Sequence, residues 1–487
     1  MSALQKLFKH TFIYGLATVL PRILTVLLTR LYTDKFPTDE YGVVSLVFAW
    51  MVFFNVVLSY GMETAFFRFI NKKKNPETVQ STALGMLLIS SLGFLVLMLP
   101  LRDSIGAFTN IPVTYITYAL FILVFDALVV IPFAWLRHQQ RSIKYTYIKI
   151  TNVVINLSLN LFFFLALPLL SDTTENSFLK FIDQGENKIS YVFMANLAAS
   201  VCTLLWLLPL YVKIGLRIHT NIVKQMLRYG LPVLVAGMAF AVNEHFDKIL
   251  LEKLLPQDIA RSQVGVYSAC YRLGVFMTLF VTAFKLGVEP FFFSHAKDRD
   301  APETYARITL YFSIFAAFIL LFVVVYVDIF KMLLIAEAYW EAMWIVPVIL
   351  IANLFLGLYH NLSVWYKVTD RTRYGAYISV VGALITLVLN VALIPVIGYK
   401  GSALATLVAY GTMMILSYVI GRKKYPIPYK VSKISMYLGV SVLFSILSFY
   451  QFQRNLLIGN GLLLVFLTIV YLNEKDQFQK IISKNDH

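Results

Sequence analysis

Residues 228–255 read RYGLPVLVAGMAFAVNEHFDKILLEKLL, and residues 264–297 read VGVYSACYRLGVFMTLFVTAFKLGVEPFFFSHAK. Each stretch is long enough and apolar enough for a helix that crosses a bilayer, which needs about 20 residues. Ionisable side chains nevertheless interrupt both stretches. Because a charge in hydrocarbon is costly, such side chains usually face a bundle interior or a water-filled cavity. The two stretches therefore predict a polar site inside a membrane-embedded bundle.

The composition of the whole chain supports a membrane protein. Of the 487 residues, 59% are hydrophobic and 14% are charged, which is outside the range of soluble globular proteins. The apolar residues come in blocks of about 18 to 25 residues and not in the alternating ten-residue segments of an outer-membrane barrel. We predict an all-α polytopic membrane protein with about 14 transmembrane helices. The first block is too long for a signal-peptide core and lacks a cleavage site, so we keep it as a helix.

The hydrophobic blocks and the breaks between them give the expected positions of these helices. With a spanning length of about 20 residues, we predict helices at roughly 10–32, 41–62, 79–100, 113–136, 148–170, 191–212, 227–253, 264–286, 304–328, 342–365, 374–397, 401–421, 434–451 and 455–473.

The distribution of basic residues sets the expected topology. An even number of spans places both termini on one side of the membrane, and the loops on that side carry most of the 42 Lys and Arg residues. By the positive-inside rule this side is the cytoplasm. Because the basic residues are spread over short loops, the formal net charge of +16 does not indicate a nucleic-acid partner.

Two sequence patterns recur in the two halves of the chain. The pattern GxExxFF occurs at residues 61–67 and again at residues 287–293. A set of residues that begins at Arg141 recurs without gaps from Arg371 onward. These matches in the same order favour a duplicated unit of six helices.

The repeat predicts a domain organisation. We expect one six-helix bundle at 1–218, a second at 219–425, and two further helices with a cytoplasmic tail at 426–487. Because each unit has an even number of spans, the two bundles should be related by an axis along the membrane normal, around a central cavity. Transporters with this organisation bind substrate between the halves and work by alternating access.

Arg22 and Asp126 are the candidates in the first bundle. Arg22 lies about 12 residues into the first predicted helix, near the bilayer midplane at ~1.5 Å per residue, and Asp126 lies at a similar depth in the fourth. Arg22 is predicted to line a cavity and bind an anionic substrate, and Asp126 is a candidate for ion coupling. The alternative is a buried Arg22–Asp126 pair that only holds the bundle together.

Four further candidates lie in the stretches quoted first. Glu244, Asp247 and Lys248 share one helix face, because they are spaced i, i+3 and i+4. They either form a proton or sodium coupling site beside a substrate contact, with Lys248 as the contact, or Glu244 and Lys248 neutralise each other. Arg272, about 8 residues into the next helix at ~1.5 Å per residue, is predicted to bind substrate.

Other polar residues receive structural interpretations. Interhelical hydrogen bonds explain the stripe Asn152, Asn156 and Asn160 better than a cavity wall does. Glu63 and Glu289 lie beside basic residues at predicted helix ends, so we interpret them as structural. No metal site is expected, because no His pairs with Cys, Asp or Glu at ligand spacing. Without a P-loop, a nucleophile motif or a loop long enough for a soluble domain, neither a cofactor nor an enzymatic activity is predicted.

Several segments resemble a known family. The stretches quoted first, FRFINKKK at residues 67–74 and LNVALIPVIGYKGSALATLVAYG at residues 389–411, resemble bacterial polysaccharide-export flippases. These form the Wzx-like branch of the multidrug/oligosaccharidyl-lipid/polysaccharide exporter superfamily. The similarity covers essentially the whole chain, but its motifs are apolar helix patterns of moderate specificity.

The resemblance implies a function. It implies translocation of an undecaprenyl-pyrophosphate-linked oligosaccharide to the outer leaflet of the bacterial cytoplasmic membrane, for a polymer such as O-antigen or another surface polysaccharide. Cationic cavity residues of such proteins meet pyrophosphate or acidic sugars, a role that the resemblance transfers to Arg22 and Arg272, with Lys248 behind them. Membrane lipids and other polysaccharide-assembly membrane proteins are the expected partners. The alternatives are a cation-coupled multidrug antiporter and a membrane-embedded polymerase, ligase or glycosyltransferase.

Overall fold

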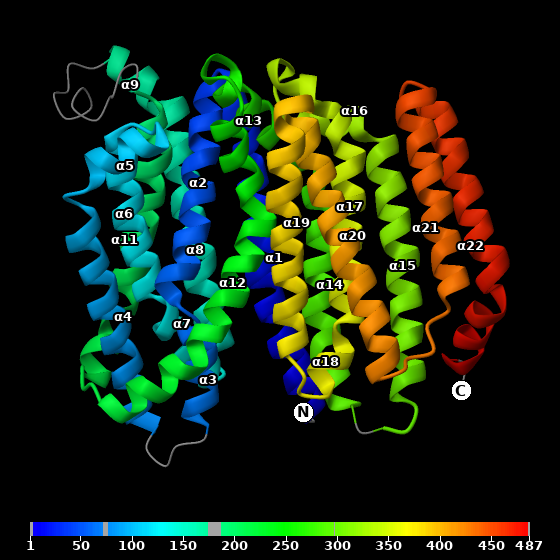
Figure 1. The fold of residues 1–487 in the computed structure, drawn as a ribbon, viewed down its shortest axis with the longest axis horizontal. Coiled ribbons are helices and arrows are strands. Elements are labelled where there is room, and N and C mark those ends of the chain that lie inside the picture. Colours follow the sequence, from blue (N-terminus) through cyan, green and yellow to red (C-terminus); the bar gives the residue numbers. More distant parts are fainter. Residues whose placement is uncertain (1–2, 72–75, 174–186, 297, 486–487) are drawn as a thin grey trace. The chain divides into compact units, whose positions relative to one another are not determined.

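The computed structural model describes residues 3–71, 76–173, 187–296 and 298–485, and every element assigned in these ranges is helical (Figure 1). Thirteen helical segments of this described part are long and apolar enough to cross a membrane. They are preceded by α1 (Ala3–Lys35), a helix of 33 residues. The prediction of an all-α polytopic membrane protein is confirmed. The basic residues of the loop at 72–75 and most of the loop at 171–188 lie outside the described residues.

Contacts divide the chain into two compact units. Unit 1 consists of residues 1–268 with 390–395, and unit 2 consists of residues 269–389 with 396–487. The boundary between the units therefore lies fifty residues beyond the limit that the repeat predicts for the first bundle, and the repeat-based domains stay a prediction.

Unit 1 holds the first half of the helices. Several of them begin directly after a Pro or Gly, at residues 37, 61, 112 and 256, as the breaks in hydrophobicity predict. After α1 its elements are α2 (Thr38–Ser59), α3 (Met62–Ile70), α4 (Pro76–Met98), α5 (Arg102–Thr109), α6 (Val113–Leu128), α7 (Val130–His138), α8 (Ser142–Leu161), η1 (Phe162–Ala166), α9 (Leu167–Thr173), α11 (Ile189–Ile214), α12 (Thr220–Leu254) and most of α13 (Gln257–Tyr271).

Unit 2 holds the remaining helices. Its elements are η2 (Arg272–Gly274), α14 (Val275–Ser294), α15 (Ala301–Val325), α16 (Val327–Leu334), η3 (Glu337–Trp344), α17 (Ile345–Leu362), α18 (Val364–Val368), α19 (Arg373–Ile397), α20 (Tyr399–Lys424), α21 (Val431–Ile446), η4 (Leu447–Gln451) and α22 (Leu456–Asn485).

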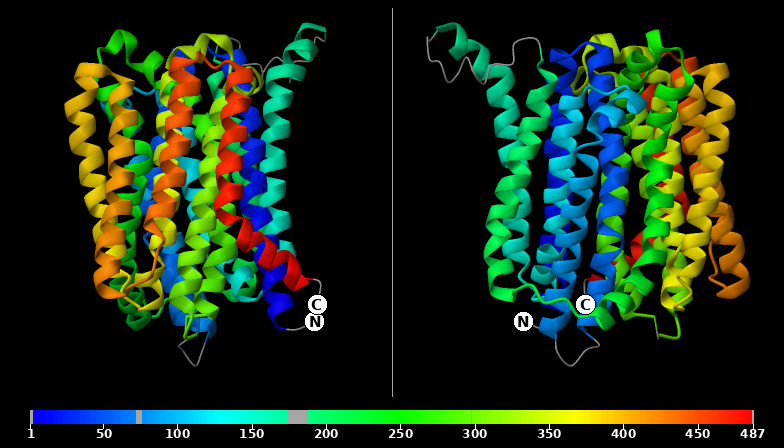
Figure 2. Two further views of the ribbon diagram at one scale, coloured as in Figure 1. Left: turned by 90° about the vertical axis from the view of Figure 1, so that its right-hand side faces the viewer. Right: turned by 60° about the vertical axis from the view of Figure 1, so that its left-hand side comes forward.

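The last two long helices, α21 and α22, pack on α15 (Figures 1 and 2). Tyr437 of α21 and Phe466 of α22 are fully buried in a core that they share with Leu321 of α15. Polar contacts reinforce this core, because Ser441 Oγ donates a hydrogen bond of 2.6 Å to the carbonyl of Ala317. Within a bilayer such a helix contact is stabilised mainly by van der Waals packing and interhelical hydrogen bonds, because lipid chains are as apolar as the side chains.

A break in the second helix brings two backbones of unit 1 together. Tyr60 and Gly61 both have positive φ, 30° and 70°, and they separate α2 from α3. A Cβ at Gly61 would lie 2.6 Å from the carbonyl oxygen of Gly230 in α12. Gly61 therefore permits the left-handed turn, and Gly61 and Gly230 together permit the close approach of α12.

Candidate functional site

A polar cavity of about 710 Å³ lies within unit 1. Five parts of the bundle contribute to its wall, namely the α2–α3 segment, the α6–α7 segment, α8, α11 and α12. Its polar lining residues are Asn55, Ser59, Glu63, Thr64, Asp126, Lys149, Asn152, Asn196, Ser200 and Thr203. A cavity with so many polar groups between membrane-length helices is the arrangement expected of a polar path.

Asp126 is the acidic centre of this cavity. The hydroxyl of Ser200 on α11 donates a hydrogen bond of 2.8 Å to its Oδ1. Lys149 on α8 lines the same cavity, and its Nζ lies 4.4 Å from the ring centroid of Phe133. Asp126 and Lys149 thus place a carboxylate and an ammonium group that attract each other in this cavity, held by a hydroxyl and an aromatic face. A second carboxylate, Glu63, also lines the cavity.

Amide and hydroxyl groups complete the wall. Asn152 Nδ2 donates to Thr203 Oγ1 at 2.9 Å, which joins α8 to α11. Further along α8, Tyr32 Oη of α1 donates to Asn160 Oδ1 at 2.8 Å. Interhelical hydrogen bonding is therefore confirmed for these two members of the Asn stripe. Asn152 also lines the cavity, so this residue both forms an interhelical hydrogen bond and belongs to the cavity wall.

One of the cavity-lining residues, Glu63, forms an ion pair. Glu63 Oε1 on α3 lies 2.5 Å from Arg137 Nη1 on α7, and Arg68, its neighbour on α3, instead lies over the ring of Tyr229 at 4.2 Å. In unit 2 the corresponding residue Glu289 pairs with Lys367 at 2.5 Å. Both pairs join a GxExxFF segment to the helix end that precedes the next repeated segment.

Asp247 and Lys248 form a separate buried pair on α12. Lys248 Nζ lies 3.0 Å from Asp247 Oδ1, and Tyr267 Oη of α13 donates a hydrogen bond of 2.6 Å to Asp247 Oδ2. Asp247 is 1% exposed and Lys248 is 9% exposed. Glu244, one turn earlier, lies 3.7 Å from His245 Nε2. The structure thus brings three of the predicted residues to one segment of α12, with Asp247 and Lys248 in direct contact.

Arg22 and Arg272 lie at exposed positions. Arg22 is exposed on α1, in unit 1. Arg272 is exposed in the 3-10 turn η2, in unit 2. Of the six predicted site residues, Asp126 is the one found in the lining of the polar cavity. Within the described ranges, the structure brings together no three His, Cys, Asp or Glu side chains that could hold a metal ion.

Seven of the ten polar lining residues escaped the sequence analysis, Lys149 and Asn196 among them. Lys149 stands among the basic residues at the start of a predicted helix, where a role in topology explains a lysine. Asn196 is a single amide in an apolar block, with hydroxyl residues at helical spacing, Ser200 at i+4 and Thr203 at i+7. Only the packing of α11 on α6 and of α8 on α11 places both in the cavity that Asp126 lines. A search for uncharged polar residues within the predicted spans would have singled out Asn196.

A family of known proteins matches more than half of this chain in sequence. The model of the polysaccharide biosynthesis protein family matches residues 7–294. No curated protein matches the chain.

Solved structures share the fold. The lipid II flippase MurJ, in an inward closed conformation, aligns with a TM-score of 0.70 at 15% identity over 95% of this chain and 99% of its own. An inward-facing multidrug resistance MATE family transporter of the MOP superfamily aligns with a TM-score of 0.64 at 14% identity over 88% of this chain and 96% of its own. A MOP superfamily transporter from Pyrococcus furiosus aligns with a TM-score of 0.58 at 15% identity over 87% of this chain and 98% of its own.

These identities are low, so the likeness to solved structures shows only that this chain shares the fold of these proteins. The resemblance predicted from the sequence is confirmed by the family match. Because that match extends over more than half of the chain, the protein belongs to the polysaccharide biosynthesis protein family.

Proposed function

We propose that this protein is a flippase that moves an undecaprenyl-pyrophosphate-linked oligosaccharide from the inner to the outer leaflet of the bacterial cytoplasmic membrane. The observation that carries the proposal is the polar cavity of unit 1, which places amides, hydroxyls, two carboxylates and one ammonium group between spanning helices. Sugar hydroxyls both donate and accept hydrogen bonds, and these groups offer both. The family match supports a carbohydrate polymer as the product of the pathway.

The charged headgroup sets a second requirement. A pyrophosphate cannot cross hydrocarbon bare, because an unpaired charge there is costly. We assign its binding to Arg22 and Arg272, with Lys248 as a further contact. Exposure of both arginines supports this assignment, and the guanidinium group offers a forked, permanently charged donor set. Lys248 already contacts Asp247, so its part in binding requires that pair to open.

The acidic candidates have different proposed roles. Asp247 is held by Lys248 and Tyr267, which favours charge pairing. Asp126 lines the cavity, which favours ion coupling. Glu244, beside His245, stays a candidate for either role.

The setting of the protein follows from the same proposal. We place both termini in the cytoplasm, on the basis of the positive-inside rule. The expected partners are the lipid-linked oligosaccharide, membrane lipids and other membrane proteins of polysaccharide assembly. The equal positions of the Glu63–Arg137 and Glu289–Lys367 pairs support two duplicated six-helix units that alternate access to the substrate.

A cation-coupled multidrug antiporter is the second candidate function. The observation that favours it is the carboxylate of Asp126 in a cavity within the bundle, because a carboxylate binds organic cations, protons or sodium. Lys149 in the same cavity opposes it, since its ammonium group repels a cationic drug.

Reconstitution separates these functions. We would measure transbilayer movement of a fluorescent undecaprenyl-pyrophosphate oligosaccharide in proteoliposomes that hold equal amounts of wild type, Arg22→Ala or Arg30→Ala. Arg30 is the matched control, because it lies on the same helix and pairs with Asp34 at 2.8 Å. Wild type and Arg30→Ala should move the lipid, and Arg22→Ala should move it at least tenfold more slowly.

Two results would contradict the proposal. Failure of wild type to move any lipid-linked glycan, together with exchange of organic cations for protons or sodium, would replace the flippase by the antiporter. Equal rates for Arg22→Ala and Arg30→Ala would remove Arg22 from the headgroup site while leaving the flippase function in place.

A further inference from the structure

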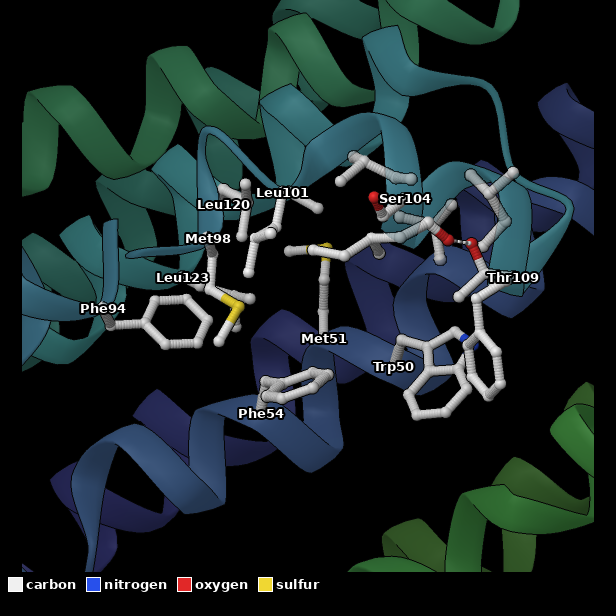
Figure 3. A pocket seen from close by; sticks show the side chains of 16 residues that line it. Trp50, Met51, Phe54, Phe94, Met98, Leu101, Ser104, Thr109, Leu120 and Leu123 are labelled. Carbon is white, nitrogen blue, oxygen red and sulfur yellow. Dashed lines mark hydrogen bonds between the residues drawn. The ribbon is translucent and has the colours of Figure 1, made fainter. Parts of the chain in front are cut away.

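A second cavity, of about 340 Å³, lies elsewhere in unit 1 (Figure 3). Helices α2, α4 and α6 form its walls, and the short helix α5 with the turn before it covers one end. Figure 3 shows Met51 reaching into this space between Phe54 and Trp50 of α2 and the leucines of α4–α6. Its lining residues are Val47, Trp50, Met51, Phe54, Phe94, Met98, Leu101, Ser104, Ile105, Phe108, Thr109, Ile111, Ile116, Ala119, Leu120 and Leu123. None of them lines the polar cavity.

This second cavity, the apolar cavity, offers little to a polar ligand. Ser104 and Thr109 are the lining residues with hydroxyl groups. The hydroxyl of Thr109 already donates a hydrogen bond of 2.7 Å to the carbonyl of Ile105. A sugar or an ion in this space would lose its hydrogen bonds to water and gain few in return. Apolar cavities of this kind bind hydrocarbon.

The apolar cavity has an opening on the lipid-facing surface. Leu101 and Phe108 both line it, and they are also 47% and 70% exposed. On α4, just before this opening, Val96 and Leu97 are 74% and 65% exposed. In a membrane-spanning chain such side chains contact lipid. Arg102 and Asp103 at the start of α5 are also exposed, so the opening lies where the apolar surface of α4 meets charged side chains, as at the boundary between lipid chains and headgroups.

Two cations lie at the same corner. Lys253 Nζ donates a hydrogen bond of 2.5 Å to the carbonyl of Phe108 and lies 5.2 Å from its ring centroid. Arg261 Nη2 donates a hydrogen bond of 2.5 Å to the carbonyl of Asn110. Glu252, 3.5 Å from Lys253, offsets one of the two charges. Among the charged side chains with these contacts, the two cations outnumber the one carboxylate beside the apolar opening.

We propose that the apolar cavity binds one hydrocarbon chain of an anionic bilayer phospholipid, whose phosphate is held by Lys253 and Arg261. The apolar lining excludes the polar part of any ligand, and the cations at the opening attract phosphate and repel a cationic drug. The bilayer supplies such lipids at high local concentration. The bound chain would fill the space under α5 and hold the α4–α6 corner.

Fluorescence quenching of Trp50 tests the proposal without any transport measurement. Bromine atoms on a lipid chain quench a tryptophan on contact. The protein would be reconstituted with phosphatidylglycerol, brominated or not, as wild type and as Trp50→Phe, so that the difference reports Trp50 among the six tryptophans. Trp206, 41% exposed, and Trp365, 1% exposed, serve as the lipid-contacting and protein-buried references, each through its own Phe variant.

The filled variant Ala119→Phe supplies the matched control, because Ala119 lines the apolar cavity. Brominated phosphatidylglycerol should quench Trp50 by more than half in wild type. In Ala119→Phe this quenching should fall at least twofold, while quenching of Trp206 stays unchanged. Ala119→Met replaces Ala119→Phe if the larger side chain prevents folding, judged by size-exclusion chromatography and circular dichroism.

Several outcomes would overturn the proposal. Quenching of Trp50 no greater than that of Trp365, or equal quenching in wild type and the filled variant, would show that no chain enters the apolar cavity. Equal quenching by brominated phosphatidylcholine would show that binding does not depend on an anionic headgroup. Unchanged quenching in the double variant Lys253→Ala with Arg261→Ala would show that these two cations do not hold the phosphate. Relief of quenching by undecaprenyl phosphate at low concentration would assign the apolar cavity to the cargo lipid instead.

Discussion

At the scale of single residues, Asp247 is the most constrained charged group of the predicted site. Its carboxylate accepts hydrogen bonds from the Tyr267 hydroxyl, from Lys248 Nζ and from the Lys248 backbone N–H. Asp247 is 1% exposed, so these three donors replace the hydrogen bonds that its carboxylate would make with water. Removal of Asp247 would leave the ammonium of Lys248 buried without its carboxylate.

We therefore expect Asp247→Ala to destabilise the protein by about 3–5 kcal/mol, as for other broken buried pairs. Thermal unfolding of the purified protein in detergent measures the effect. The double variant Asp247→Leu with Lys248→Met removes both charges and should recover most of the lost stability, because neither charge is then left alone. A double variant as unstable as the single one would contradict this account.

Transport by that double variant decides the role of Lys248. If Lys248 binds the headgroup, the stable double variant should lose transport of the lipid-linked oligosaccharide. Full transport would mean that Asp247 and Lys248 only fasten α12 to α13.

Asp126 gives a second residue-scale prediction. Its hydrogen bond from Ser200 survives replacement by asparagine, whose side-chain oxygen also accepts. We expect Asp126→Asn to fold with nearly unchanged thermal stability and to lose the dependence of transport on a proton or sodium gradient. Transport of the variant should be compared with and without each gradient. Unaltered gradient dependence in a folded Asp126→Asn would exclude Asp126 as the coupling residue.

At the scale of elements, glycine sets how closely helices of unit 1 approach. A Cβ at Gly265 of α13 would lie 1.8 Å from the carbonyl oxygen of Thr38, at the start of α2. A Cβ at Gly42 of α2 would lie 2.0 Å from the carbonyl oxygen of Arg261. Both contacts are with backbone, so a side chain at either position must separate the two helices.

Gly265→Ala should consequently lower the thermal midpoint of unfolding by several degrees, because backbone cannot move aside as a flexible side chain does. Gly93→Ala in α4 is the matched control, since a Cβ there meets nothing within 4 Å. Alanine in a helix interior is about 1 kcal/mol more favourable than glycine, so the control should be unchanged or more stable. Equal loss of stability in both variants would refute the close-packing explanation.

The repeated segments also show what a shared local sequence produces. Gln140 and Asp370, which occupy equivalent positions of the repeat, both have positive φ, 53° and 56°. The following residues, Arg141 and Arg371, each donate a backbone hydrogen bond to a carbonyl five residues earlier, at 2.9 and 2.8 Å. The two helix ends therefore have one conformation in both units, which supports the proposed duplication.

At the scale of the whole molecule, the orientation in the membrane is the main prediction still to be measured. Asp103 on α5 belongs to a loop that we place outside, and Arg299 follows α14 in a loop that we place in the cytoplasm. After replacement of Cys202 and Cys270, a membrane-impermeant maleimide should label Asp103→Cys in intact cells and should label Arg299→Cys only after lysis. Labelling in the opposite order would invert the topology and the direction of transport.

The sequence by itself determined the helical, membrane-spanning fold. Blocks of about 20 apolar residues can satisfy their backbone hydrogen bonds in a bilayer only as helices, so length and composition are sufficient. The helix Tyr399–Lys424 lies within three residues of the predicted bounds 401–421, and the helix Thr220–Leu254 ends one residue from its predicted end but begins seven residues before its predicted start. Polar turns that end the hydrophobic blocks explain the agreement. The family resemblance was also readable, since it is carried by these same helix patterns.

Only the tertiary structure decided which polar side chains meet. Asp126 and Lys149 come from different helices, and no spacing in the sequence relates α6 to α8. The same holds for Asp247 and Tyr267, which are 20 residues apart and joined by a hydrogen bond of 2.6 Å. Helix packing in a membrane depends on small residues, crossing angles and interhelical hydrogen bonds, which hydrophobicity does not encode. For this reason the sequence predicted charged candidates one by one, whereas the structure gathered Asp126 with neutral amides and hydroxyls into a cavity.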